Sequence, residues 1–234
     1  MLKATGWRDR LTPGWLLRSL LASRGTIQAP LGPEWHGDLA IIRETRALVP
    51  LLMNDAAALQ ILLCARAACS LGGAMAEAGV LMGGSARLIC EAKGAAPLHL
   101  FDIFETLQAG PGATDEQEEV RLHFGAIHGQ KEAVERLLSP YPAVNVHPGF
   151  FPASAADLAE VRFSFVHLDL DLPPSTRAGL EFFHPRLVAG GILIGDDYND
   201  RGVRRTFERF LEGGRDTVIA LPWGQVMIVK QGED

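Results

Sequence analysis

Two short apolar runs that end in aspartate constrain the fold of this chain more than any other feature. Residues 165–171 read FVHLDLD, and residues 192–198 read ILIGDDY. A short apolar run that ends in polar residues is typical of a strand buried in a parallel sheet. Open α/β sheets bind their ligands at the carboxyl ends of such strands. The two runs therefore predict an α/β sheet with an acidic, metal-binding site along its carboxyl edge.

The composition fits one large folded domain. The chain has 234 residues, of which 47% are hydrophobic and 21% charged, and its net charge is −6. A negative charge removes the attraction to phosphate backbones, so we expect no nucleic-acid partner. No apolar run reaches the ~20 residues that span a bilayer, and no signal-peptide pattern is visible. Three cysteines without CxxC spacing predict buried thiols. We expect a cytoplasmic protein that has no membrane partner.

The first 37 residues differ from the rest of the chain. They contain Trp7, Trp15 and Trp35 among prolines, with one helical stretch near residues 16–21. We expect an amino-terminal helical arm at residues 1–37, followed by a single domain at residues 38–234. The arm could be a lid, a dimer contact or a surface extension, and the second reading makes a homodimer the expected assembly.

Helix and strand patterns alternate along the predicted domain. Helices are expected at residues 38–48, 54–68, 86–93, 130–138, 157–160, 175–183 and around 203–211. Strands are expected at residues 74–79, 98–102, 143–147, 163–169 and 192–196, with a turn at Gly190-Gly191 before the last of them. The stretch 74–102 alone forms a complete βαβ unit.

The carboxyl-terminal stretch departs from this alternation. Residues 217–221 and 225–229 are strand-like and are joined only by Pro222-Trp223-Gly224, which is too short for a crossover helix. The two strands must therefore be antiparallel. A mostly parallel seven-stranded sheet with an antiparallel last strand and helices on both faces resembles the Rossmann-like class I S-adenosylmethionine-dependent methyltransferases.

A glycine-rich turn follows the first predicted strand, in the sequence EAGVLMGGSA at residues 77–86. Its spacing differs from GxGxxG and no GK[ST] follows, so it is neither a clear dinucleotide fingerprint nor a P-loop. Glycines and helix-start amides let the backbone approach a ligand, so the turn, which contains Gly79, Gly83 and Ser85, is a candidate for cofactor binding. Glu77 either contacts the cofactor or holds the turn. Asp102, at the end of the next strand, either binds both ribose hydroxyls or caps the next turn.

The acidic strand ends favour a cation. Strand alternation places His167, Asp169 and Asp171 on one side, where the two carboxylates repel each other unless a cation lies between them. If the strand that ends at Asp196 and Asp197 is adjacent, these two residues and Asp169 bring three hard oxygen ligands together. That set suits Mg²⁺.

Several sequence blocks together resemble one known family. HLDLDL, FFHPRLVAGGILIGDDY, GVRRTFERF and GQVMIVK, with EAGVLMGGSA and LFDIFE upstream, are similar to the macrocin O-methyltransferase-like family of metal-dependent small-molecule methyltransferases. The likeness covers residues 74–230 and extends more loosely to Arg43. The resemblance implies metal ligands at Asp169, Asp196 and Asp197, a general base at Asp171, and a cofactor pocket that is lined by Glu77, Gly79 and Ser85 with Asp102 on the ribose.

The same resemblance implies an O-methyltransferase that uses S-adenosylmethionine and Mg²⁺ or another divalent cation. The cation would chelate a sugar-like vicinal diol of a natural product and lower the pKa of one hydroxyl, whose proton Asp171 would take. His167 is the alternative base, or a packed residue beside the metal. Pro173-Pro174 stands where the family usually has an aromatic residue and an acid, so the substrate class is harder to infer from the family. A catechol-type methyltransferase and a non-catalytic binding module are the alternatives.

Overall fold

The structure is a computed structural model that describes residues 31–104 and 131–232. The chain divides into two units, residues 1–37 and residues 38–234. Most of the first unit, including the helical stretch expected near residues 16–21, lies outside the described residues. The proposed role of the arm as a lid or a dimer contact therefore stays a prediction.

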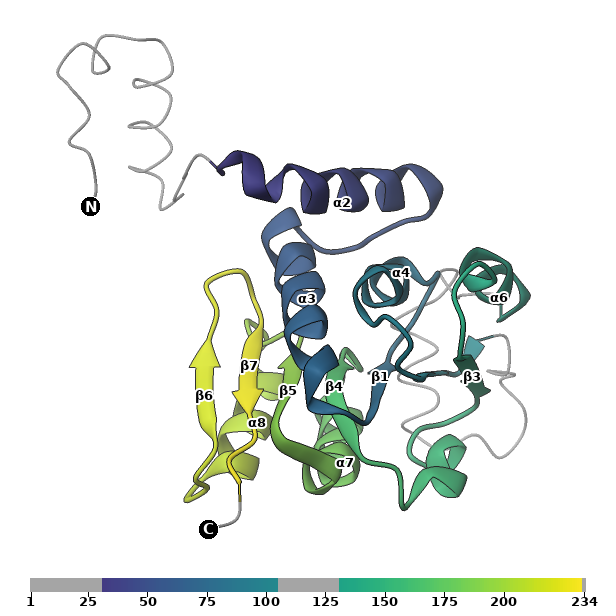
Figure 1. Cartoon of the computed structure of the whole chain (residues 1–234). Helices are drawn as coiled ribbons and strands as arrows, with labels where there is room; N and C mark the ends of the chain where they lie inside the picture. The colour runs from purple at the N-terminus through teal and green to yellow at the C-terminus, as the bar shows by residue number, and fades with distance from the viewer. Residues whose placement is uncertain (1–30, 105–130, 233–234) are drawn as a thin grey trace, which may run out of the picture. The chain divides into compact units, whose positions relative to one another are not determined.

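A seven-stranded sheet forms the centre of the second unit, in the order β3-β2-β1-β4-β5-β7-β6. β7 runs antiparallel to both of its neighbours, and the other strands are parallel (Figure 1). The expected architecture is thus confirmed, with β7 inserted between β5 and β6. The strands are β1 (Ala74–Ala78), β2 (Leu98–Asp102), β3 (Val144–Pro148), β4 (Phe163–Leu168), β5 (Leu187–Gly195), β6 (Thr217–Ala220) and β7 (Val226–Val229).

Helices cover both faces of the sheet (Figure 1). The α-helices are α2 (His36–Leu48), α3 (Asp55–Ala68), α4 (Gly84–Ala92), α6 (Lys131–Leu138), α7 (Pro173–Phe183) and α8 (Arg201–Leu211). Short 3-10 helices are η2 (Pro33–Trp35), η3 (Cys69–Leu71), η5 (Ala153–Leu158) and η6 (His184–Arg186). The amino end of α3 is capped by Asn54, whose side chain accepts a hydrogen bond from Ala57 N at 3.0 Å.

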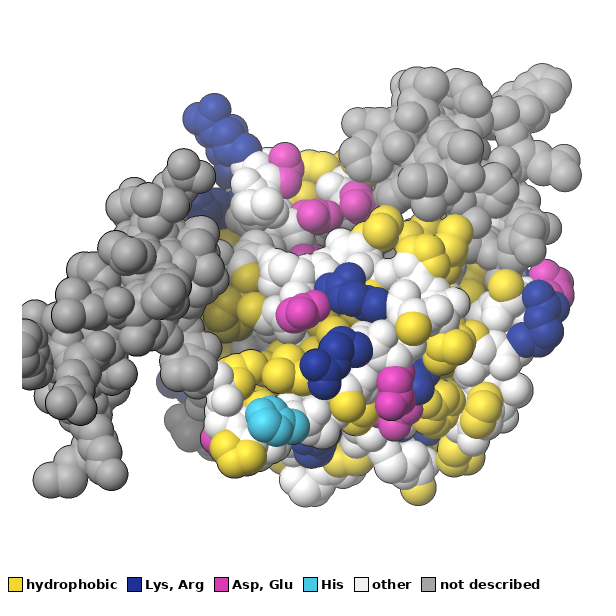
Figure 2. Space-filling view, turned by 90° about the horizontal axis from the view of Figure 1, so that it is seen from above, with side chains coloured by type: hydrophobic (Ala, Val, Ile, Leu, Met, Phe, Trp, Pro, Cys, Tyr) yellow, Lys and Arg dark blue, Asp and Glu magenta, His cyan; other side chains and the backbone are white. Residues whose placement is uncertain are grey.

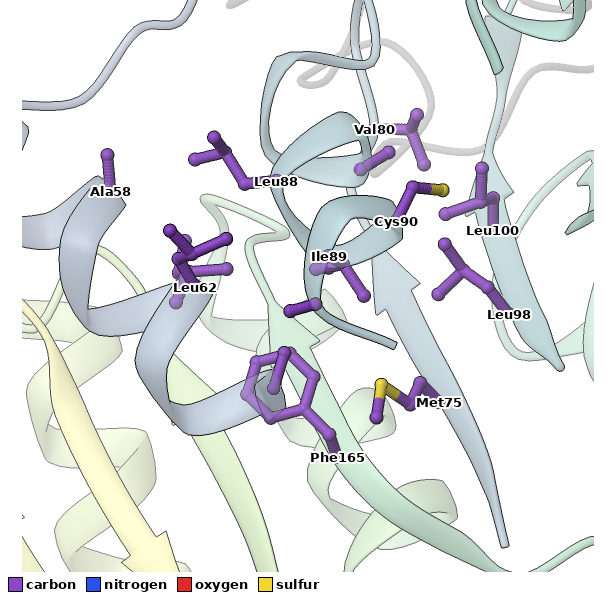
Figure 3. Packing of buried hydrophobic residues seen from close by; sticks show 14 of the residues in the cluster. Ala58, Leu62, Met75, Val80, Leu88, Ile89, Cys90, Leu98, Leu100 and Phe165 are labelled. Carbon is purple, nitrogen blue, oxygen red and sulfur yellow. The ribbon is translucent and has the colours of Figure 1, made fainter. Parts of the chain in front are cut away.

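Two hydrophobic cores lie on opposite faces of the sheet. On one face, apolar side chains of α3 and α4 pack against those of β1, β2 and β4, among them Leu62, Ile89 and Phe165 (Figure 3). On the other face, α7 and α8 pack through residues that include Phe183 and Phe207. The central strands β1 and β4 are buried along their full length, which explains why their sequences read as nearly continuous apolar runs.

The strand register brings the predicted site residues to one edge. Ala78 of β1 pairs with Leu168 of β4, which pairs with Gly195 of β5. The hydrogen bonding continues one residue further, since Asp169 N donates to Ala78 O at 2.8 Å and Asp196 N donates to Leu168 O at 2.9 Å. The backbone positions of these two aspartates are therefore set by the sheet itself.

Several element boundaries differ from those expected. β4 ends at Leu168, and the short helix near residue 157 is the 3-10 helix η5. Gly190-Gly191 is not a turn before a strand but lies inside β5, which begins at Leu187. Gly190 has φ +77°, and the pairing of β4 with β5 shifts register between Phe163 and Phe165. The glycines therefore mark a bulge, which bends a strand without ending it.

Two of the three cysteines are buried, as the sequence predicts. Cys64 and Cys90 are buried as expected, but Cys69 is exposed at the end of α3, where its thiol donates to Lys93 O at 2.8 Å. Basic and acidic side chains are interspersed on the face shown in Figure 2. Within the described ranges, no helix combines the length and the apolar character that crossing a bilayer requires.

Candidate active site

A cavity of about 250 Å³ opens beside the carboxyl edge of the sheet. Its walls come from the segment 50–53 before α3, from the loop between β1 and α4, and from the acidic loops after β4 and β5. Of the residues that the sequence singled out, those lining the cavity are Gly79, Ser85, Asp102, Asp169, Asp171, Asp196 and Asp197. Glu77, Gly83 and His167 do not line it.

The glycine turn is wedged against the backbone that follows β4. Gly79 has φ +90°, and a Cβ atom placed there would lie 1.6 Å from the carbonyl oxygen of Asp169. The space left by its missing side chain is thus filled by the chain itself, and a ligand does not need to occupy it. Gly83, with φ +84°, caps the amino end of α4. Glycine is required at both positions because φ is positive, and at Gly79 it also allows the turn to lie against the backbone of Asp169, the first aspartate of the site.

Asp102 holds the same turn from the other side. Its Oδ2 accepts hydrogen bonds from Val80 N at 2.7 Å and Leu81 N at 2.8 Å, and its Oδ1 accepts one from Phe104 N at 3.1 Å. The capping alternative is therefore present in the structure. A carboxylate has about four acceptor positions, so this capping leaves Asp102 able to accept from a ligand hydroxyl in the cavity.

Four aspartates gather at the edge of the sheet in two overlapping groups. One group is His167, Asp169 and Asp196, and the other is Asp169, Asp171 and Asp197. Within each group the possible ligand atoms lie within 4.8 Å of one another. The predicted ligand set of Asp169, Asp196 and Asp197 draws on both groups, which meet at Asp169.

The loops that carry these acids have unusual backbone conformations. Asp171 has φ +57° and Asp197 has φ +54°, in the left-handed region. Asp171 thus lies in a turn and not on an extended strand, so strand alternation is not the reason that it faces the cavity. Aspartate tolerates this region better than most residues, and non-glycine residues there often mark functional sites.

Burial and mutual repulsion together raise the pKa values of two aspartates of the cluster. Burial and the nearby charge of Asp196 raise the pKa of Asp169 well above its usual value. Burial, together with the charge of Asp197 and a hydrogen bond to it, raises the pKa of Asp171 to about 7. Burial would also raise the pKa of Asp196, but the nearby His167 and a hydrogen bond from Gln225 lower it. A divalent cation would relieve this repulsion, so the donor set fits a hard metal ion.

Glu77 and His167 form a buried pair beneath the cluster. Both side chains are 0% exposed, and His167 Nδ1 lies 2.7 Å from Glu77 Oε1. On its other side, His167 Nε2 lies 3.5 Å from Asp196 Oδ2, which is an ionic contact longer than a good hydrogen bond. Burial alone would lower the pKa of His167, but Asp196 and Glu77 raise it to about 10. The pair supports Asp196 from inside the protein, and Glu77 does not reach the cavity.

Gln225 and Arg46 contribute to the site, although no sequence pattern singled them out. Gln225, just before β7, is fully buried and donates to Asp196 Oδ2 at 3.1 Å. A polar residue opening an otherwise apolar strand was the available signal. The segment 50–53 is held by Arg46 of α2, which donates to Leu51 O at 2.6 Å and also to Met53 O. These carbonyl groups lie five and seven residues beyond Arg46, outside the regular spacing of a helix.

The unusual Pro173-Pro174 pair begins a helix. Pro173 is the first residue of α7, where a missing N–H and a fixed φ are well tolerated. Its ring packs toward α8, since a Cβ added at Gly202 would lie 2.8 Å from Pro173 Cγ. Neither proline lines the cavity, whereas Ser175 does.

Comparisons with known proteins agree with this arrangement. The pattern of the family described as Macrocin-O-methyltransferase (TylF) matches residues 58–219, which is more than half of the chain. One curated relative, from Streptomyces olivaceus, is 8-demethyl-8-(2,3-dimethoxy-alpha-L-rhamnosyl)-tetracenomycin-C 4'-O-methyltransferase. It is 32% identical over 138 residues, which are 54% of this chain and 53% of the relative. The chain thus spans about half the length of the curated relative that it matches.

Solved structures show the same fold. The O-methyltransferase NovP superposes with a TM-score of 0.61 at 20% identity, over 75% of this chain and 79% of that one. An O-methyltransferase from Bacillus cereus in complex with SAH superposes with a TM-score of 0.53 at 16% identity, over 92% and 97% of the two chains.

Proposed function

Since the chain belongs to the Macrocin-O-methyltransferase (TylF) family, we propose that it methylates a hydroxyl group of a sugar-like vicinal diol, using S-adenosylmethionine and Mg²⁺ or another divalent cation. The observation that carries the proposal is the cluster of four aspartates along one wall of a cavity whose other wall is the glycine turn with Asp102. The relative that acts on a dimethoxyrhamnosyl group supports a sugar as the acceptor.

The wall formed by the glycine turn would hold the methyl donor. S-adenosylmethionine supplies the methyl group as a sulfonium, which carries no phosphate and needs no P-loop. Asp102 is fixed by three backbone amides and keeps about one acceptor position for a ribose hydroxyl. Leu51 and Met53, held in place by Arg46, give the cavity an apolar side that suits a purine ring.

Asp169, Asp196 and Asp197 would hold the cation. When bound, it acidifies a hydroxyl of the acceptor and orients the diol. The carboxylates of Asp169 and Asp196 are anchored through the backbone hydrogen bonds that extend the sheet beyond β4 and β5. The acceptor would therefore meet ligands that are already arranged.

Asp171 is the proposed general base. It lines the cavity, and its carboxylate lies within 4.8 Å of possible ligand atoms of Asp169 and Asp197, next to the position where a cation-bound hydroxyl would be presented. His167 is fully buried, and its Nδ1 is engaged with Glu77. This placement favours Asp171 over His167 for removing a proton from the acceptor.

A direct assay tests the proposal. The protein is incubated with S-adenosylmethionine, Mg²⁺ and a panel of glycosides that carry vicinal hydroxyls, alongside matched deoxy-glycosides and catechols, and mass spectrometry detects a single added methyl group. We expect methylation of intact diols and its loss on chelation. Transfer to catechols alone would refute the sugar assignment, transfer that survives chelation would refute the metal, and no transfer to any acceptor would refute the enzyme.

Three further sequence expectations remain proposals. A natural product as the acceptor follows from the family and from the relative's name. The homodimer and the cytoplasmic location rest on the sequence alone. Light scattering on the purified chain tests whether it forms a homodimer.

A further inference from the structure

Gln225 is a buried amide whose two ends are both used. Its Nε2 donates to Asp196 Oδ2 at 3.1 Å, and its Oε1 accepts from Trp223 Nε1 at 3.1 Å. Reversing the amide would set its NH₂ against the indole N–H and its oxygen against the carboxylate, and neither contact could be a hydrogen bond. The tryptophan therefore fixes which end of Gln225 faces the aspartate.

The turn that carries Gln225 is joined to the acidic loop at several points. Gly224 O accepts from Tyr198 N at 2.8 Å, and the pairing of β7 with β5 sets Val226 opposite Gly195. Gln225 O also accepts from Leu221 N at 2.8 Å, which closes the β6–β7 hairpin. The hairpin and the loop that presents Asp196 thus form one connected unit.

The carboxylate of Asp196 has a defined orientation as a result. Oδ2 receives the amide of Gln225 and faces His167, while Oδ1 accepts from Asp197 N at 3.1 Å. Each oxygen keeps a lone pair for another partner. A carboxylate held in this way loses little rotational freedom when it binds a cation, so the holding group should strengthen cation binding.

We infer that Gln225, oriented by Trp223, is a positioning residue that holds Asp196 for divalent-cation binding. The inference rests on the proposed function, and it gives the antiparallel hairpin a specific task at the site. Gln225 does not line the cavity, so it acts on the cation through Asp196 and not on the methyl donor.

Calorimetric titration with Mn²⁺ and, separately, with S-adenosylhomocysteine tests this role. Gln225→Met keeps the side-chain volume and removes both hydrogen bonds. We expect it to weaken Mn²⁺ binding by roughly tenfold or more, while S-adenosylhomocysteine binding stays within about twofold of the wild type. Gln231→Met is the matched control, because Gln231 is exposed and its amide donates to Thr217 Oγ1 at 3.0 Å, and it should change neither affinity.

Trp223→Phe provides a second, milder variant. It removes only the N–H that orients the amide, so Mn²⁺ binding should weaken in the same direction by less, and this variant decides the matter if Gln225→Met fails to fold. Unchanged Mn²⁺ affinity in the folded variants would overturn the inference and leave the proposed function intact. An equal loss of both affinities would overturn it as well, because general loosening of the fold would then suffice. A wild-type protein that binds no Mn²⁺ would overturn the proposed metal site itself, and with it the role of Gln225.

Discussion

Replacing Glu77 by glutamine tests whether the pair beneath the acidic cluster is structural. The substitution keeps the volume of the side chain, so no cavity forms, and it removes one charge from a pair whose members are both 0% exposed and 2.7 Å apart. Removing one partner of a buried ion pair typically destabilises a protein by about 3–5 kcal/mol, because the other charge stays buried. His167 can lose its proton in response, so we expect the lower end, about 3 kcal/mol.

Urea denaturation followed by circular dichroism and tryptophan fluorescence measures this loss. Glu181→Gln is the matched control, since Glu181 pairs with Arg177 on the exposed face of α7 at 2.8 Å. An exposed helical pair of this kind contributes about 0.3–0.5 kcal/mol. If Glu77→Gln destabilises the protein no more than Glu181→Gln does, the pair does not support the site and the reasoning is refuted.

Three other predictions concern the acidic edge, the glycine turn and a histidine pair. Asp171→Asn should lower kcat at least about 100-fold and leave S-adenosylhomocysteine affinity nearly unchanged, and an unaffected kcat would exclude Asp171 as the base. Gly79→Ala should abolish either folding or cation binding, because its Cβ would overlap the Asp169 carbonyl; soluble, cation-binding protein would contradict the proposed close approach. Burial and the neighbouring His147 lower the pKa of His99 to about 4, so the folded state binds its proton less readily than the unfolded state, whose pKa is about 6.5. Stability should therefore fall as pH decreases from about 6.5 to about 4, and His99→Gln should flatten that decrease in a pH series of urea melts.

Much of the fold could be predicted because its signals are local. The apolar runs of β1 and β4 report burial on both faces of a sheet, and the short link at residues 222–224 allows only antiparallel strands. The bulge at Gly190 could not be predicted. Glycine pairs serve equally well in turns, and only the partner strand shows that β5 continues through them.

The candidate site also contains some residues that the sequence could predict and others that it could not. The aspartates could be found because each directly follows an apolar strand, and the register of the sheet then brings them together. The role of Glu77 could not be assigned from the sequence, because one pattern, an acid before a glycine turn, fits both a cofactor contact and a buried ion pair. What distinguishes them is His167, paired opposite Glu77 on β4 and 90 residues away in the chain. Gln225 acts on Asp196, 29 residues away in the chain, and no local pattern reveals that contact.

The central claim is that Asp169, Asp196 and Asp197 hold one divalent cation at the carboxyl edge of the sheet. Anomalous diffraction at the manganese absorption edge, from crystals grown with Mn²⁺, tests it most directly. The account predicts a single strong peak about 2.1 Å from carboxylate oxygens of Asp169, Asp196 and Asp197. A protein that shows no peak among these carboxylates at saturating Mn²⁺, or one only elsewhere, would contradict it.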